Sequence, residues 1–147
     1  MNRKLLLHGM VLFLLGLLTG LAAPQLRNMR MGISAHLEGV LNGMFLLGLG
    51  LAWGEIRLPE RARKLAAGLV LYGAYANWTA TLLAAALGTS KLTPIAGAGF
   101  TGSAAAEALV SLLLVTVALS MVAAVSLFIA GLRTKTDTAA QASTGTI

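Results

Sequence analysis

The sequence contains no cysteine, which excludes disulfide bonds, thiolate metal ligands and a cysteine nucleophile. With only two histidines, a zinc site is not expected either. The chain has no HExxH motif, no phosphate-cradling glycine-rich motif and no evident Ser-His-Asp constellation. Aromatic residues make up 5% and charged residues 11% of the 147 positions, so a soluble domain of this size would lack polar cover for its surface.

What the sequence does contain is apolar mass, at 57% hydrophobic residues that are chiefly Leu, Ala and Val, with 17 glycines beside them. Glycine is common in membrane-spanning helices, and the length suits one domain. Four segments approach the roughly 20 apolar residues that cross a bilayer core. They cover about residues 5–23, 36–53, 65–87 and 104–132. The sequence therefore predicts an all-α membrane protein, a bundle of four transmembrane helices over residues 1–133.

The net charge of +6 is better explained by membrane topology than by nucleic-acid binding. The basic residues lie between apolar runs and have no aromatic residues interleaved with them. Eight fall on one side of the predicted spans and three on the other. The eight are Arg3, Lys4, Arg57, Arg61, Arg63, Lys64, Arg133 and Lys135, and the three are Arg27, Arg30 and Lys91. The positive-inside rule then places both termini in the cytoplasm, with the chain in the inner membrane.

The two ends of the chain raise separate questions. The first segment can also be interpreted as a signal peptide cleaved near "GLAAP". Its length of about 19 residues exceeds the usual apolar region of a signal peptide, and Pro24 is a poor residue directly after a cleavage point, so a retained span is favoured. Residues 134–147, "TKTDTAAQASTGTI", are small and polar and are expected to be a disordered tail.

Polar residues within the predicted spans mark candidate functional positions, because such residues are costly in a bilayer and normally face the bundle interior or a cavity. They are His8, His36, Glu38, Asn42, Tyr72, Tyr75, Asn77, Thr81 and Glu107. For His8 an interfacial or hydrogen-bonded position is favoured. For Glu107 the favoured interpretation is a carboxylate that stabilises a helix N-terminus.

The segment "AHLEGVLNGMF" concentrates three of these residues at the head of an apolar run. At about 100° per residue, Glu38 and Asn42 share one face, and His36 lies with Gly39 and Gly43 on a stripe rotated by roughly a third of a turn. The glycine pair allows close approach of either another helix or a flat cofactor with His36 as its ligand.

The third predicted span carries a matching polar face, since Gly73, Asn77 and Thr81 follow at intervals of four residues. The second and third spans can thus form facing walls of one polar cavity. Asn77 and Thr81 can equally act as interhelical glue, because such bonds are worth about 0.6 kcal/mol on average.

The order of these motifs resembles a known family. "HGMVLFLLGLLTGLAAP" followed by "MRMGISAHLEGVLNGMFLLGLGLAW" resembles hydroxylaminobenzene mutase, a small four-span membrane enzyme that converts hydroxylaminobenzene to 2-aminophenol. The resemblance extends through "YGAYANWTATLLAAALG", weakens over the fourth span and is absent from the tail. The chain is more distantly similar to styrene oxide isomerase, which also pairs an early His-Gly with "AH" and then "LNGM".

The more distant resemblance implies a trimer that carries heme b, with a histidine as axial ligand and an asparagine that holds the substrate. The matching residues are His36 and Asn42. That isomerase also uses a tyrosine in its third span, whereas the matching position here lies near Thr81, so no such role carries over to Tyr72 or Tyr75.

The resemblance and the residue pattern together give one working hypothesis. His36 is expected to ligate a ferric heme that acts as a Lewis acid, with Gly39 and Gly43 beside the cofactor. Asn42 orients the migrating hydroxyl group of a small aromatic hydroxylamine, Glu38 carries a proton or supports a histidine, and Asn77 completes the pocket. A heme-free mutase that uses Glu38 and Asn42 as an acid/base pair remains open, as does a non-enzymatic membrane subunit or small transporter.

Overall fold

The structure is a computed structural model that describes the backbone of residues 1–144 and the side chains of residues 1–133. This part of the chain contains helices and no strand. The four α-helices are α1 (Arg3–Ala22), α2 (Met29–Ala52), α3 (Glu60–Leu87) and α4 (Ala104–Thr144), and two short 3-10 turns, η1 (Ala23–Gln25) and η2 (Trp53–Glu55), follow α1 and α2.

The helix ends follow from identifiable side chains. The Asn2 side chain accepts hydrogen bonds from the backbone N–H groups of Lys4 at 3.1 Å and Leu5 at 3.3 Å, and this caps α1. In the same way the Asn28 side chain accepts from the Met31 N–H at 3.2 Å and caps α2. At the C-terminal end of α3, Gly88 has a φ of +69°, the left-handed conformation that commonly ends a helix.

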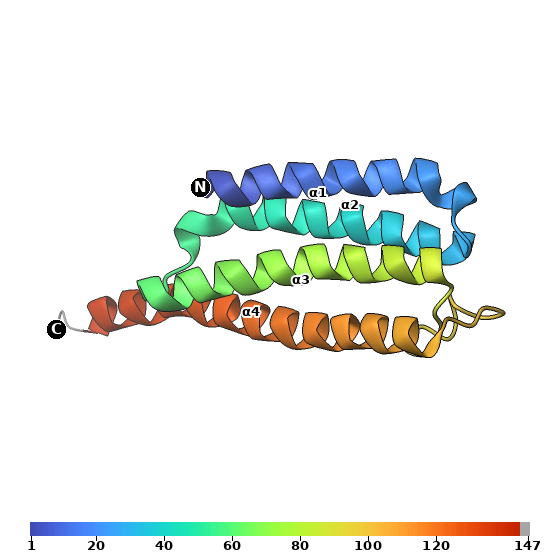
Figure 1. Cartoon of the computed structure of the whole chain (residues 1–147). Coiled ribbons are helices and arrows are strands. Elements are labelled where there is room, and N and C mark those ends of the chain that lie inside the picture. Colours follow the sequence, from blue (N-terminus) through green and yellow to red (C-terminus); the bar gives the residue numbers. More distant parts are fainter. Residues whose placement is uncertain (145–147) are drawn as a thin grey trace.

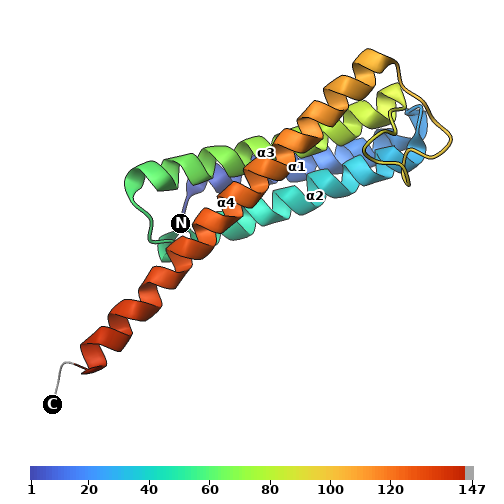
Figure 2. The same cartoon turned by 90° about the horizontal axis from the view of Figure 1, so that it is seen from below.

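Helices α1, α2 and α3 lie side by side along one long axis, and α3 packs against both α2 and α4 (Figure 1). The η1 turn and the α3–α4 loop are at one end of the molecule, and the N-terminus and the α2–α3 connection are at the other. Figure 2 shows that α4 crosses the other helices at an angle and projects beyond them at its C-terminal end. The order in space therefore follows the order in the chain.

Two helices extend beyond the predicted membrane spans. The second helix begins at Met29 rather than near His36, because the Asn28 cap starts it before the segment "MRMGISA". The polar residues of this helix thus lie well inside it. The fourth helix continues to Thr144, past the predicted span and into the predicted tail, and the alanines and the glutamine of "TAAQA" suit a helix; disorder of the tail stays a prediction. Residues 145–147 of that tail lie outside the described part.

Three of the helical segments are long and apolar enough to cross a membrane: Arg3–Gln25, Met29–Glu55 and Ala104–Arg133. The α3 helix is not among them. Its apolar run is interrupted by aromatic and polar side chains, including Tyr72, Tyr75 and Asn77. The described part of the chain therefore agrees with an all-helical membrane protein, and the membrane span predicted over α3 stays a prediction.

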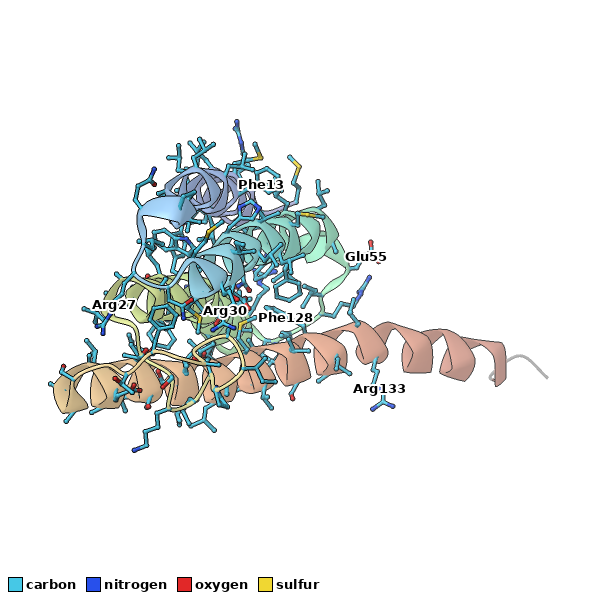
Figure 3. All side chains as sticks on the ribbon, turned by 90° about the vertical axis from the view of Figure 1, so that its right-hand side faces the viewer. Phe13, Arg27, Arg30, Glu55, Phe128 and Arg133 are labelled. Atoms are coloured by element: carbon cyan, nitrogen blue, oxygen red, sulfur yellow. The ribbon has the colours of Figure 1, made fainter. Side chains whose placement is uncertain are left out.

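At the loop end, the α1–α2 turn is fastened to the α3–α4 loop by side chains that donate to backbone carbonyls. Asn28, which is fully buried, donates to Ala96 O at 2.9 Å. Arg27 donates to Leu87 O at 2.8 Å and to Thr101 O at 3.3 Å, and Arg30 donates to a carbonyl of the same loop. Arg27 and Arg30 lie beside this loop in Figure 3. We call these three residues the loop latch.

At the opposite end, Phe128 of α4 packs edge-on against Trp53, with ring centroids 6.1 Å apart. At the start of α3, Glu60 accepts a hydrogen bond from Arg63 at 2.6 Å and lies 3.3 Å from the Lys64 ammonium. The Arg63 hydrogen bond holds the pKa of Glu60 below its usual value. This exposed cluster marks the more basic end of the molecule.

Candidate functional site

The glycines of α2 pack directly against the backbone of α1. A Cβ atom added to Gly39 would lie 2.5 Å from Gly16 Cα, and one added to Gly43 would lie 2.7 Å from the backbone nitrogen of Phe13. Of the two expectations for this glycine pair, close helix packing is therefore the one realised. Within one chain α1 occupies the space beside Gly39 and Gly43, and their assignment to a cofactor stays a prediction.

His36 lies at the edge of the same interface. Its Nδ1 is 2.8 Å from Gly16 O, and a Cβ added to Gly20 would lie 2.8 Å from that ring nitrogen. Because a carbonyl oxygen only accepts, Nδ1 carries the proton and donates it to Gly16 O. In the neutral ring the lone pair is then on Nε2. A backbone carbonyl that fixes the ring in this way is a common arrangement for a metal-ligating histidine.

Glu38, Asn42 and Asn77 form a second polar group, between α2 and α3. The Asn42 side chain donates from Nδ2 to Glu38 Oε2 at 3.1 Å, and the Asn77 side chain donates from Nδ2 to the same oxygen at 2.5 Å. Asn42 is buried, and the other two are half-buried. We call these residues the carboxylate–amide cluster. The predicted facing of the second and third helices thus brings all three together on one carboxylate oxygen.

His36 and this cluster lie on different sides of α2. Residues 36 and 38 project about 160° apart around a helix, and residues 36 and 42 about 120° apart. The hydrogen bonds agree, because His36 bonds to α1 and Glu38 to α3. Within one chain, the histidine therefore does not share a cavity with Glu38, Asn42 and Asn77.

A tryptophan that the sequence analysis did not select braces the cluster from α3. Trp78 directly follows Asn77, and its indole N–H donates to Thr19 Oγ1 on α1 at 3.1 Å. A Cβ added to Gly39 would lie 3.0 Å from Trp78 Cδ1, so the ring also contacts α2. Trp78 therefore fixes the register of α3 against α1 and α2. Its position between Asn77 and Thr79 in a polar stretch was the available signal.

Three other polar residues in the helices also have hydrogen-bond partners. His8 Nδ1 is 3.2 Å from the Tyr75 hydroxyl, and the two rings pack edge-on, so the hydrogen-bonded interpretation of His8 is confirmed. Tyr72 hydrogen-bonds to the Thr116 hydroxyl at 2.6 Å on α4. The Thr81 hydroxyl donates to Asn77 O at 2.9 Å within its own helix.

Glu107 lies in the first turn of α4, and its carboxylate accepts from the loop. The backbone N–H groups of Ser90, Lys91 and Gly102 donate to it at 2.9, 3.0 and 3.3 Å. This agrees with the structural role favoured for Glu107, and the carboxylate also orders the loop between α3 and α4.

The donor set limits what the chain can hold. Among the described residues, no group of three His, Cys, Asp or Glu side chains is placed to bind a metal ion. A heme needs only one axial side chain, and His36 fits that requirement through Nε2 because Gly16 O accepts from Nδ1. The expected cofactor therefore fits His36 as its single side-chain ligand.

Comparison with known proteins agrees with the resemblance noted in the sequence. The model of the styrene oxide isomerase family matches residues 1–133. Hydroxylaminobenzene mutase HabB from Ectopseudomonas oleovorans is 53% identical over 132 residues, which cover 89% of this chain and 80% of that protein. Hydroxylaminobenzene mutase HabA from the same organism is 40% identical over 133 residues, covering 90% and 98% of the two chains. No solved structure matches this chain.

Proposed function

Because the chain belongs to the styrene oxide isomerase family and is an isomerase, we propose that it converts hydroxylaminobenzene to 2-aminophenol. The hydroxyl group leaves nitrogen and joins the ortho carbon, and the proton on that carbon is lost as another returns to nitrogen. Substrate and product are isomers, so the reaction consumes no oxidant or reductant. The proposal rests on the two relatives that carry the name of this activity.

One structural observation supports the proposal above the others. Glu38, Asn42 and Asn77 come from two helices and meet at a single carboxylate oxygen. A carboxylate can accept the proton released at the ortho carbon and return it to nitrogen, and the asparagine amides can orient the hydroxylamine. The assigned roles are proton transfer for Glu38 and substrate orientation for Asn42 and Asn77.

His36 is the residue that would hold a heme, through Nε2. When bound, a ferric heme supplies a Lewis acid for the N–O bond. Because His36 faces away from Glu38 within one chain, the heme-dependent reaction needs a neighbouring copy to bring both groups to one substrate. This geometry supports an oligomer, for which we propose a trimer. It also favours, as the alternative, a heme-free reaction carried by Glu38 and Asn42 alone.

The proposed setting is the inner membrane, with four spans and both termini in the cytoplasm. The three apolar helices support insertion, and the excess of basic residues at the end that holds the N-terminus and the start of α3 supports the orientation. A small aromatic hydroxylamine partitions into lipid, so it can reach the cluster from the bilayer. A dry site also protects reactive intermediates from hydrolysis.

The test is turnover of hydroxylaminobenzene by protein purified in lipid nanodiscs, with 2-aminophenol measured by chromatography. Asn77→Ala and Asn42→Ala are expected to lower kcat about tenfold or more, because each removes a group within hydrogen-bonding distance of Glu38. Ser120→Ala on α4 is the matched control, since among the described residues that hydroxyl bonds only to Val117 O of its own helix. Wild-type turnover in both asparagine variants would contradict the assigned roles, and absence of turnover in the wild type would contradict the activity.

An absorption spectrum of the same preparation separates the two routes. A Soret band that shifts when hydroxylaminobenzene is added, and that is lost in His36→Ala, would support heme on His36. Turnover without any Soret band would place the reaction on Glu38 and Asn42.

A further inference from the structure

Two glycines of α1, one helical turn apart, face different kinds of atoms on α2. A Cβ added to Gly16 would meet backbone, with Val40 N at 2.6 Å and Gly39 C at 2.8 Å. For Gly20, the three nearest atoms would all belong to the His36 ring: Nδ1 at 2.8 Å, Cγ at 3.1 Å and Cε1 at 3.2 Å. Gly16 therefore lets two helices approach, whereas Gly20 leaves room for one side chain.

The place of this room follows from the carbonyl that His36 uses. In an α-helix each C=O points towards the residue four positions later, whose N–H donates to it. A ring that lies outside α1 and donates to Gly16 O at 2.8 Å must therefore lie beside residue 20. A side chain at that position would meet the ring. Glycine is the residue that leaves the bond from His36 to Gly16 O undisturbed.

We infer that Gly20 is a positioning residue for His36: because it lacks a side chain, it seats the ring with Nδ1 on Gly16 O and keeps the lone pair of Nε2 for a metal. The inference rests on the heme-dependent form of the proposed function. The ring atoms nearest to Gly20 do not include Nε2, so the seat holds the ring by its other edge. A ring that loses this seat can carry its proton on Nε2, and that tautomer has no lone pair there for a metal.

The test variant is Gly20→Ala. Its added methyl group would meet the atoms of a rotatable side chain, so the ring turns away from Gly16 O while the helices keep their distance. The variant is therefore expected to change the state of the His36 ring at nearly unchanged resistance to unfolding. Gly48→Ala is the matched control, because a Cβ there has no atom within 4 Å.

The first readout is the tautomer of the ring, measured by ¹⁵N NMR of histidine-labelled, full-length protein in nanodiscs without heme. Spectra are taken at about pH 9, where an ordinary histidine ring is neutral. The chain has two histidines, and His36→Ala identifies the signals of His8. The wild type should carry the proton chiefly on Nδ1. Loss of one hydrogen bond should lower the ratio of the Nδ1–H to the Nε2–H tautomer about fivefold in Gly20→Ala.

The second readout is the affinity for hemin, titrated into the same preparation and followed by the Soret band. Loss of the group that orients a metal-ligating histidine typically weakens binding tenfold or more. Gly20→Ala should therefore bind hemin about tenfold more weakly than the wild type, and Gly48→Ala should bind it equally well.

An unchanged tautomer ratio or an unchanged hemin affinity in Gly20→Ala would overturn the inference, as would a wild type that binds no hemin. If Gly20→Ala does not fold, the double variant Gly20→Ala/His36→Ala decides. Recovery of folding in the double variant would show that the methyl group conflicts with the His36 ring, as the inference requires. Failure of the double variant would overturn it, because Gly20 would then be needed for something else.

Failure of the proposed function gives a different result. A wild type that binds hemin and shows both effects of Gly20→Ala, yet does not convert hydroxylaminobenzene, contradicts the activity and leaves the role of Gly20 intact. Turnover by a protein in which Gly20→Ala changes neither readout contradicts the role of Gly20 alone.

Discussion

The contact between Gly16 and Gly39 sets the distance between α1 and α2, so Gly39→Ala should separate these helices. The added Cβ would lie 2.5 Å from Gly16 Cα and 2.9 Å from Gly16 N. Ordinary contact between carbon atoms needs about 3.5 Å, so α1 has to move by roughly 1 Å. Backbone atoms cannot rotate aside as a flexible side chain does. The same movement lengthens the 2.8 Å bond from His36 to Gly16 O.

The expected magnitude follows from three contributions. Overpacking costs about 1–3 kcal/mol, and loss of the histidine bond about 1 kcal/mol. The higher helix propensity of alanine relative to glycine stabilises the protein by about 1 kcal/mol. Gly39→Ala should therefore destabilise the protein by about 1–3 kcal/mol. Gly48→Ala in the same helix is the control, because its Cβ would have no atom within 4 Å, and it should stabilise by about 0.5–1 kcal/mol.

The assay is reversible unfolding in mixed micelles, followed as the mole fraction of denaturing detergent is raised. Wild type, Gly39→Ala and Gly48→Ala are compared under identical conditions. Equal stability of the two variants would refute the reasoning, because it would mean that the helices do not approach at Gly39.

Three further predictions concern groups outside the glycine interface. Asn28→Ala should destabilise the protein by about 2–3 kcal/mol, because it removes a helix cap and leaves the Ala96 carbonyl without its donor. Asn2→Ala removes a cap alone and should cost about 1 kcal/mol in the same unfolding titration. Trp78→Phe should cost about 0.6 kcal/mol, and a double-mutant cycle with Thr19→Val should show that this energy belongs to their shared bond, with additive effects contradicting it. Glu107→Gln should increase the rate of proteolysis in the α3–α4 loop at unchanged cleavage of the α2–α3 connection, since one amide oxygen replaces a carboxylate that holds three backbone N–H groups.

The sequence predicted the helices well because apolar length is a property of each segment by itself. It predicted the helix starts less well. The N-terminal extension of α2 depends on Asn28, whose role as a cap is set by contacts that also include Ala96 in a distant loop. A window of local hydropathy does not contain that information.

The sequence likewise predicted some features of the candidate site and missed others. Helical phase placed Glu38 with Asn42 on one face and His36 on another, and the structure shows the same separation. Phase could not say which helix each face meets. The face of α2 that meets α1 is determined by the glycines of α1, which let that helix pack directly against Gly39 and Gly43. Trp78 was missed because its role depends on Thr19, a partner far away in sequence.

The loop latch has a consequence for the order in which the chain is assembled. The glycine contacts between α1 and α2 join segments that are near in sequence, so this hairpin can form while the ribosome is still making the rest. The latch residues, by contrast, wait for carbonyls that are made some 60 to 74 positions later. Until then Arg27, Arg30 and the Asn28 NH₂ group lack the backbone acceptors that they bind in the complete chain. Synthesis of the α3–α4 loop therefore adds a second connection between the two hairpins, after Asn77 and Trp78 of α3 can already bond to α2 and α1.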